Sequence, residues 1–112
     1  MDTAIFHIVP TQLWEQAGEP YAPTSLATEG FIHCSTAAQV PRTAAALFAG
    51  RFDLLLVEID PGRLDAPVRW EDCYETGERF PHLYGPLPGG AVIDVHTYRP
   101  DDRGRFPHPR QR

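Results

Sequence analysis

Three histidines are the residues of this sequence best suited to chemistry. His7 and His33 each lie in an apolar stretch, and His82 lies in a segment rich in proline and aromatic residues. An imidazole titrates near neutral pH and can both donate and accept hydrogen bonds, so it suits acid–base catalysis and ligand binding. A histidine inside an apolar strand needs polar partners, and a backbone carbonyl in the core would satisfy His7 equally well. All three are candidate catalytic residues if the fold brings them together.

The stretch around His33 offers further polar groups. If it forms a strand, the alternation of side chains places His33 and Ser35 on one face and Cys34 on the other. Ser35 and Thr36 are therefore candidate ligand-binding residues, and Ser25, in the preceding loop, is another. Because Cys34 points away from His33, a buried structural thiol is expected there rather than a nucleophile.

The segment around His82 combines a fixed backbone with polar side chains. Its prolines and glycine restrict its shape, and Tyr84 brings an aromatic hydroxyl near the imidazole, which makes Tyr84 a candidate ligand-binding residue. Glu71 lies on the polar side of a predicted strand, where it could act as a general base or stabilise a developing positive charge. The simpler alternatives are a histidine that caps a carbonyl and a solvated carboxylate.

The spacing of potential ligands predicts no metal site and no phosphate loop. The sequence has no His-Glu-x-x-His motif, and Cys34 and Cys73 lack the paired spacing of a zinc site, so both are read as reduced thiols. No glycine-rich loop follows a predicted strand, which argues against Rossmann and P-loop binding of nucleotides.

The distribution of charge argues against nucleic-acid binding. Up to Tyr98 there are five arginines and thirteen acidic residues, a net charge of minus eight, whereas the segment 99–112 adds plus three. Duplex affinity comes largely from cationic side chains that meet phosphates, so this body would repel a nucleic acid. No apolar run reaches the roughly 20 residues that span a bilayer and no secretory signal is recognisable, so we expect no membrane association and a cytoplasmic location.

The apolar patterning predicts one α+β domain over residues 1–98, followed by a flexible arginine- and proline-rich tail over 99–112. Two or three short helices are expected, one after Thr11 and one between Thr36 and Ala49. Thr36 and Gln39 form a capping-box pattern, and Pro41 favours a fresh first turn because it lacks the amide hydrogen. Strands are expected at 4–9, 31–35, 53–59, 68–71 and 91–98, with loops at 18–30 and 73–80. The apolar run at 53–59 is typical of a central strand.

The segments 5–9, 25–36, 39–41 and 79–88 stand in an order and spacing similar to the bacterial family catalogued as domain of unknown function 952. The resemblance covers about residues 4–98. It implies an ADP-ribosyltransferase-like fold, a small split mixed β-sheet whose cleft binds NAD in active relatives. It further implies that His7 holds the ribose and that Ser35 or Thr36 lies near the nicotinamide. The sequence departs from the pattern at the last acidic position, where Gly89 and Gly90 precede the final strand.

Two functions are consistent with these observations, and both need a histidine-lined polar cleft. In the first, a transferase or glycohydrolase acts on NAD, a related nucleotide or an ADP-ribosyl group, with His7, His33, Glu71 and His82 as catalytic residues. In the second, the cleft binds a small anionic metabolite through imidazoles and hydroxyls and performs no chemistry, which the missing terminal acid favours. An interaction protein that uses an apolar edge or the tail has thin support. Neither the ligand nor the oligomeric state follows from the sequence.

Overall fold

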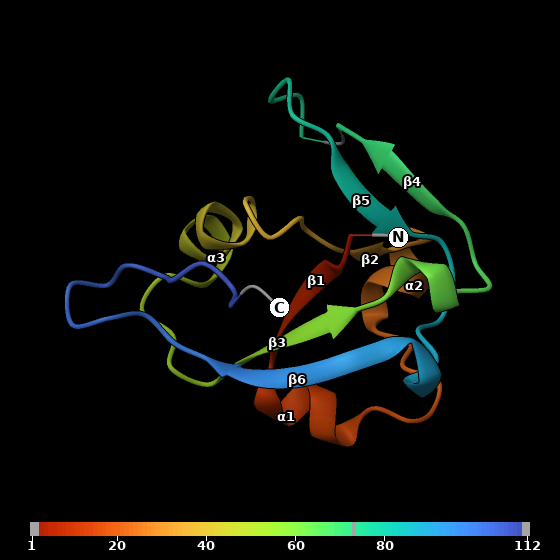
Figure 1. Ribbon diagram of the computed structural model, residues 1–112, viewed down its shortest axis with the longest axis horizontal. Coiled ribbons are helices and arrows are strands. Elements are labelled where there is room, and N and C mark those ends of the chain that lie inside the picture. Colours follow the sequence, from red (N-terminus) through yellow and green to blue (C-terminus); the bar gives the residue numbers. More distant parts are fainter. Residues whose placement is uncertain (1–2, 73, 111–112) are drawn as a thin grey trace.

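The computed structural model describes residues 3–72 and 74–110, which form two three-stranded sheets joined by short helices (Figure 1). The first sheet has the order β1–β3–β6, with β1 at Ile5–Pro10, β3 at Leu54–Ile59 and β6 at Val92–Tyr98. The second has the order β2–β5–β4, with β2 at Ile32–His33, β5 at Phe80–Leu83 and β4 at Val68–Glu71. The helices are α1 (Thr11–Gln16), α2 (Thr24–Thr28) and α3 (Val40–Phe48), and the 3₁₀ turns are η1 (Pro61–Arg63) and η2 (Gly89–Ala91).

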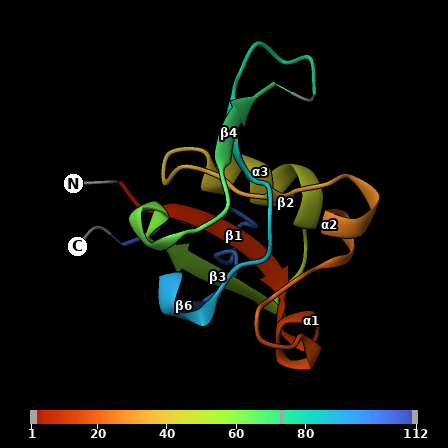
Figure 2. The same cartoon turned by 90° about the vertical axis from the view of Figure 1, so that its right-hand side faces the viewer.

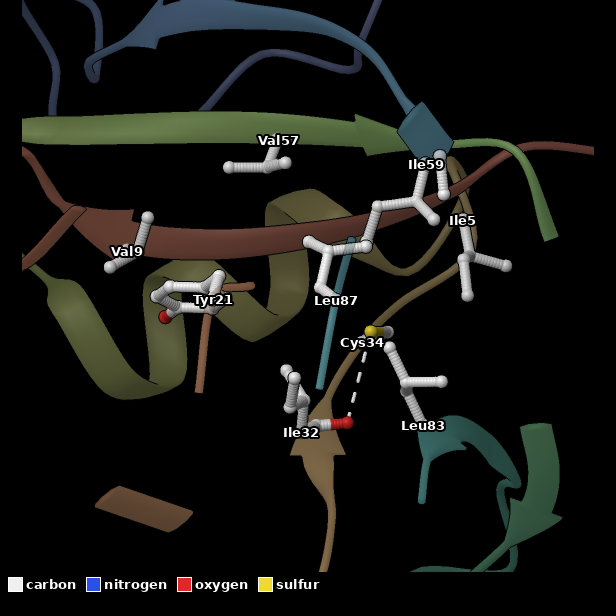
Figure 3. Close-up of a cluster of buried hydrophobic side chains, with 10 residues drawn as sticks. Ile5, Val9, Tyr21, Ile32, Cys34, Val57, Ile59, Leu83 and Leu87 are labelled. Atoms are coloured by element: carbon white, nitrogen blue, oxygen red, sulfur yellow. Dashed lines mark hydrogen bonds between the residues drawn. The ribbon is translucent and has the colours of Figure 1, made fainter. Parts of the chain in front are cut away.

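The strand pairing confirms the α+β class and corrects the expected mixed sheet. Every strand pair in the described residues is antiparallel. β3 is the central strand of the first sheet, as its apolar run predicts. Side chains on both of its faces are buried, which is why nearly all of its residues are apolar. Val57 and Ile59 meet Ile32 and Leu83 of the second sheet in the core between the sheets (Figure 3). Leu54 and other side chains of the opposite face pack in a second core that includes residues of α3.

The two sheets are joined at one isolated bridge between Phe6 and Ser35. The amide of each donates to the carbonyl of the other, at 2.8 Å in both directions. The expected strand at 31–35 is therefore divided: Ile32 and His33 pair with β5, whereas Ser35 pairs with β1. This change of partner explains why β2 is only two residues long.

The start of α3 agrees with the sequence. The Thr36 amide donates to Gln39 Oε1 at 3.0 Å and the Gln39 amide donates to Thr36 Oγ1 at 3.2 Å, so the capping-box pair forms. These bonds close a turn, and the helix then begins at Val40 with Pro41 in its first turn. Proline is tolerated there because a first-turn amide has no partner within the helix.

Two elements were missed by the sequence interpretation. α2 lies inside the loop expected at 18–30, because five residues are too few to show a helical period. β5 is the middle strand of the second sheet although Pro81 lies in it, and proline normally argues against a central strand. Pro81 keeps one ladder bond, in which its carbonyl accepts from the Cys34 amide at 3.1 Å, and lacks only the bond that its own amide would donate.

The chain after β6 folds back onto the second core, in contrast to the flexible tail predicted from residue 99. Phe106 is buried and its ring stacks on Tyr98 with centroids 5.4 Å apart. The Tyr98 hydroxyl also donates to the Pro107 carbonyl at 2.6 Å. The composition of the segment did not predict this packing, because it depends on one aromatic residue, Phe106. Cys73, expected to be a reduced thiol, lies outside the described residues, and no helix among those described is long and apolar enough to cross a membrane.

Replacing Phe106 by alanine is expected to lower the free energy of unfolding by about 2 kcal/mol, since a buried aromatic side chain is lost at the margin of a core. Urea denaturation would measure the change. Arg103→Ala, at an exposed position in the same segment, serves as the control and should change stability by less than about 0.5 kcal/mol. Equal stability of the wild type and the Phe106 variant would mean that the segment does not pack in solution.

Candidate functional site

One face of the second sheet brings together four of the eight candidate residues named from the sequence: His33, Glu71, His82 and Tyr84. His33 lies opposite His82 in the pairing of β2 with β5, and Arg69 lies opposite His82 in the pairing of β4 with β5. Residues directly opposite each other in a sheet share a face, so these three side chains form one row. Alternation along the strands adds Glu71 to the same face, while the opposite face sends Leu83 into the core. We call this surface the His33–His82 face.

His82 is the buried centre of the His33–His82 face. Its side chain has 0% exposure, and the Phe31 ring stacks on it with centroids 4.1 Å apart and planes 15° from parallel. Its Nδ1 lies 3.1 Å from Glu71 Oε1. Burial lowers the pKa of His82 below its usual value and outweighs the opposing effect of Glu71. His82 is therefore neutral at pH 7 and donates its Nδ1 hydrogen to the carboxylate.

Glu71 is held by two donors at one oxygen. Besides the bond from His82, the Tyr84 hydroxyl donates to Oε1 at 2.5 Å. The Tyr84 bond, and next to it the His82 bond, lower the pKa of Glu71. The Arg69 guanidinium lies over the Tyr84 ring, 4.6 Å from its centroid. A fixed, ionised carboxylate therefore stands beside two aromatic side chains and one cation.

His33 is the accessible imidazole of the face, with about a third of its side chain exposed. Its Nε2 lies 2.9 Å from Glu29 Oε1, and its Nδ1 lies 2.5 Å from the Tyr74 hydroxyl. The Glu29 carboxylate can only accept, so Nε2 carries a hydrogen and donates it to Glu29. The His33 ring centroid is 4.8 Å from that of Phe31 and 5.6 Å from that of His82.

His7 does not join this face. Its Nδ1 donates to the His33 carbonyl at 2.6 Å, and its Nε2 accepts from the Tyr21 hydroxyl at 2.7 Å. Both ring nitrogens thus have partners inside the protein, and burial lowers the pKa of His7 to about 4. Of the two interpretations of His7, the structure supports the core histidine satisfied by a backbone carbonyl. Its ring cannot reach a ligand on the His33–His82 face while these bonds persist.

The three hydroxyl candidates lie outside the face. Ser25 donates to the Phe31 carbonyl at 2.8 Å and so fixes the chain before β2. Ser35 is buried, and its hydroxyl donates to the Thr43 hydroxyl of α3 at 3.2 Å. It lies away from His33 because Ser35 pairs with Phe6 of β1 and no longer belongs to β2. Thr36 holds the start of α3 with Gln39. Each of the three hydroxyls has a partner within the protein: the Phe31 carbonyl for Ser25, the Thr43 hydroxyl for Ser35 and the Gln39 amide for Thr36.

Cys34 is a structural thiol, as its position predicts. It is buried in the core between the sheets, its Sγ lies 3.8 Å from the Ile32 carbonyl, and burial raises the pKa of its thiol to about 12. At neutral pH it is protonated and unreactive. Among the described residues, no group of three or more His, Cys, Asp and Glu side chains is arranged to hold a metal ion.

His33 and His82 are not among the residues that line two hollows of the described surface, of about 420 and 500 Å³. The first includes Trp14 and Tyr21, the hydrogen-bond partner of His7. The second includes Thr36 and Trp70 and borders β4.

Three residues of the face were missed as candidates. Phe31 follows from the same strand alternation that places His33, but an apolar residue gave no chemical signal. Glu29 lies four residues before His33 and ends the turn after α2, an element that the sequence did not show. Tyr74 reaches His33 from the loop between β4 and β5, and no local pattern marks that contact.

The fold and the face define a small α+β protein of two antiparallel sheets, one of which carries paired imidazoles, carboxylates and aromatic rings. The chain belongs to the family described as protein of unknown function (DUF952), whose model matches residues 8–95. It is similar to the crystal structure of protein CC0527 from Caulobacter crescentus, with 32% identity, coverage of 94% of each chain and a TM-score of 0.80. The solution NMR structure of that protein gives 32% identity, coverage of 93% of this chain and 91% of that chain, and a TM-score of 0.74. No protein of curated function matches the chain.

Proposed function

We propose that the His33–His82 face binds a small molecule with a planar, positively charged ring, and that the nicotinamide ring of NAD is the ring it fits. The observation that carries the proposal is the placement of two carboxylates near aromatic rings that solvent reaches: Glu29 and the exposed Tyr74 both bond to His33, and Glu71 bonds to the half-buried Tyr84. Carboxylates attract a cation electrostatically, and the faces of Tyr and Phe rings attract it through their quadrupoles. Aromatic rings also give a planar ligand surfaces on which to stack.

The ligand class is supported by the balance of charge and by hydrogen bonding. The body of the chain up to Tyr98 carries a net charge of minus eight, which disfavours a polyanion but favours a cationic ring. Arg69 supplies one positive charge on the same face, beside Tyr84, where it could meet a phosphate of the nucleotide. The ADP-ribosyltransferase-like grouping implied by the resemblance points to the same ligand. The proposed setting is the cytoplasm.

The binding test compares ligands that differ in the ring. Thermal stabilisation of the purified protein is expected with NAD and with the N-methylnicotinamide cation, because a ligand bound only by the folded state raises its stability. NADH, whose ring is uncharged, and ADP-ribose, which lacks the ring, should stabilise less. Glu29→Gln should reduce the difference between NAD and NADH, because it removes one of the two carboxylates that attract the charged ring, and His108→Ala, at an exposed position after β6, should not. Equal stabilisation by all four compounds, or by none, would contradict the proposal.

A second function, hydrolysis of the bound nucleotide, is favoured by the fixed Glu71 carboxylate. An ionised carboxylate close to the ribose would stabilise the positive charge that develops on C1′. Water would add to C1′ as the bond to the ring nitrogen breaks; the bonding electrons leave with neutral nicotinamide, and the proton of water is released. Glu71 could then serve the role of the acid missing before β6.

Nicotinamide release from NAD separates catalysis from binding. If the protein hydrolyses NAD, release should be lost in Glu71→Gln, which removes the negative charge but keeps a hydrogen-bond acceptor for His82 and Tyr84. Stabilisation by NAD should be smaller in that variant but still present, because the Glu29 carboxylate remains. Binding without any release of nicotinamide by the wild type would leave a binding module and exclude the hydrolase.

A further inference from the structure

The outer edge of β4 is an open strand edge. β4 is the last strand in the order β2–β5–β4, and the β4–β5 hairpin projects from the rest of the molecule (Figures 1 and 2). Arg69 and Trp70 are exposed, and half of the Trp70 surface is accessible to solvent. An open edge presents unpaired main-chain groups that can pair with another strand.

The hydrogen bonds to β5 fix which main-chain groups of β4 point outward. The Tyr84 amide donates to the Pro67 carbonyl at 2.9 Å, so the main chain of Pro67 faces β5. In an antiparallel strand, the amide and carbonyl of one residue point to the same side and successive residues alternate. The main-chain groups of Arg69 and Glu71 therefore also face β5, and those of Val68 and Trp70 point to the open edge.

The side chains of β4 are arranged so that the β4 strands of two copies of the chain can pair with each other. Arg69 and Glu71 lie on the His33–His82 face, and Trp70 lies on the other. In an antiparallel pair of two β4 strands with Trp70 opposite Trp70, Arg69 of each copy stands opposite Glu71 of the other. A pairing with Arg69 opposite Arg69 would place like charges together, and a shift by a single residue would mix the two faces.

We propose that the β4 edge is the interface for a second copy of this chain, in an antiparallel pair centred on Trp70. In this register the outward amide and carbonyl of Trp70 bond to those of the partner subunit's Trp70. The two Arg69–Glu71 pairs lie at non-hydrogen-bonded positions, where side chains come closest. The β2–β5–β4 sheets of the two copies become one continuous sheet. The exposed Trp70 rings cover each other on the face of this sheet opposite the His33–His82 face.

Pairing at the β4 edge would also change the surroundings of Glu71 on the His33–His82 face, whether or not that face binds a nucleotide. The bonds from His82 and Tyr84 to Glu71 both use Oε1. Pairing would bring the partner subunit's Arg69 to the same carboxylate. The His33–His82 faces of the two copies would then lie on one side of the joined sheet, linked through these ion pairs.

The test is the molar mass of the purified full chain, measured by sedimentation equilibrium over a range of concentrations. The wild type is expected to be a dimer that dissociates on dilution. Arg69→Glu should make it monomeric, because it sets two carboxylates opposite each other twice. Adding Glu71→Arg to Arg69→Glu should restore the dimer by exchanging the charges. A wild type that is monomeric at every concentration would overturn the proposal.

Trp70→Pro provides an independent test that spares the fold. Its amide hydrogen points outward, so proline removes a bond to the partner without removing one to β5. Circular dichroism and the melting temperature would check that the variant folds. This variant should be monomeric, and its circular dichroism should match that of the wild type. A folded Trp70→Pro protein that remains dimeric would place the interface elsewhere and overturn the proposal.

Discussion

Acidification is expected to lower the free energy of unfolding by about 3 kcal/mol through His7 alone. Its pKa falls from 6.5 to about 4 on folding, because the ring is buried. Above pH 6.5 the ring is neutral in both states and this part of the stability is fully present. Below pH 6.5 His7 becomes protonated in the unfolded chain but stays neutral in the folded protein. The free energy of unfolding therefore decreases progressively as the pH falls toward 4.

Urea denaturation at a series of pH values would measure this loss. The matched variant is His7→Gln, whose amide can donate to the His33 carbonyl and accept from the Tyr21 hydroxyl but does not titrate. Its stability should fall less steeply than that of the wild type between pH 6.5 and 4, by about 3 kcal/mol in total. His82, whose pKa is also lowered, is present in both proteins and cancels in the comparison. Parallel pH profiles would show that His7 is not buried as a neutral ring.

Removal of the Phe31 ring is expected to cost about 3–5 kcal/mol of stability, the range for truncating a buried aromatic residue. Phe31 stacks on His82 and also lies against His33 and Tyr84, so its removal exposes the buried His82 ring to water. Because burial is the main cause of the lowered pKa of His82, that pKa should rise toward its ordinary value in Phe31→Ala. Urea denaturation and NMR titration of the imidazole would measure the two effects.

The control for this substitution is Phe52→Ala, since Phe52 is 60% exposed. It should change stability by less than about 0.5 kcal/mol and leave the His82 titration unaltered. A Phe31→Ala protein that loses stability but keeps the low pKa of His82 would show that another group shields the imidazole. In that case the Phe31 ring would not be what keeps His82 from water.

The contrast between His7 and His33 bears on both proposed functions. The resemblance assigns the ribose to His7, yet its two ring nitrogens already have partners in the core. His33 is partly exposed, and its Nδ1 is bonded to the hydroxyl of the exposed Tyr74. A ligand could displace that hydroxyl with little rearrangement, whereas reaching His7 would require breaking a buried bond.

The sequence by itself determined the elements whose pattern is local. The apolar run of β3 predicted a central strand, alternation in β4 placed Arg69 and Glu71 on one face, and Thr36 with Gln39 predicted the start of α3. It also placed Cys34 on the face opposite His33. Each of these features depends on residues within a few positions of one another, so propensity and periodicity are sufficient to predict them.

Only the tertiary structure decided which of the polar residues meet. The pairing of β5 between β2 and β4 brings His82 opposite His33 and beside Glu71, three residues that lie far apart in the sequence. The same pairing separates Ser35 from them, because the chain crosses to β1 within two residues. Burial and long-range hydrogen bonding also fixed His7 in the core. Residue spacing carries no information about such contacts, since they depend on how the strands pair.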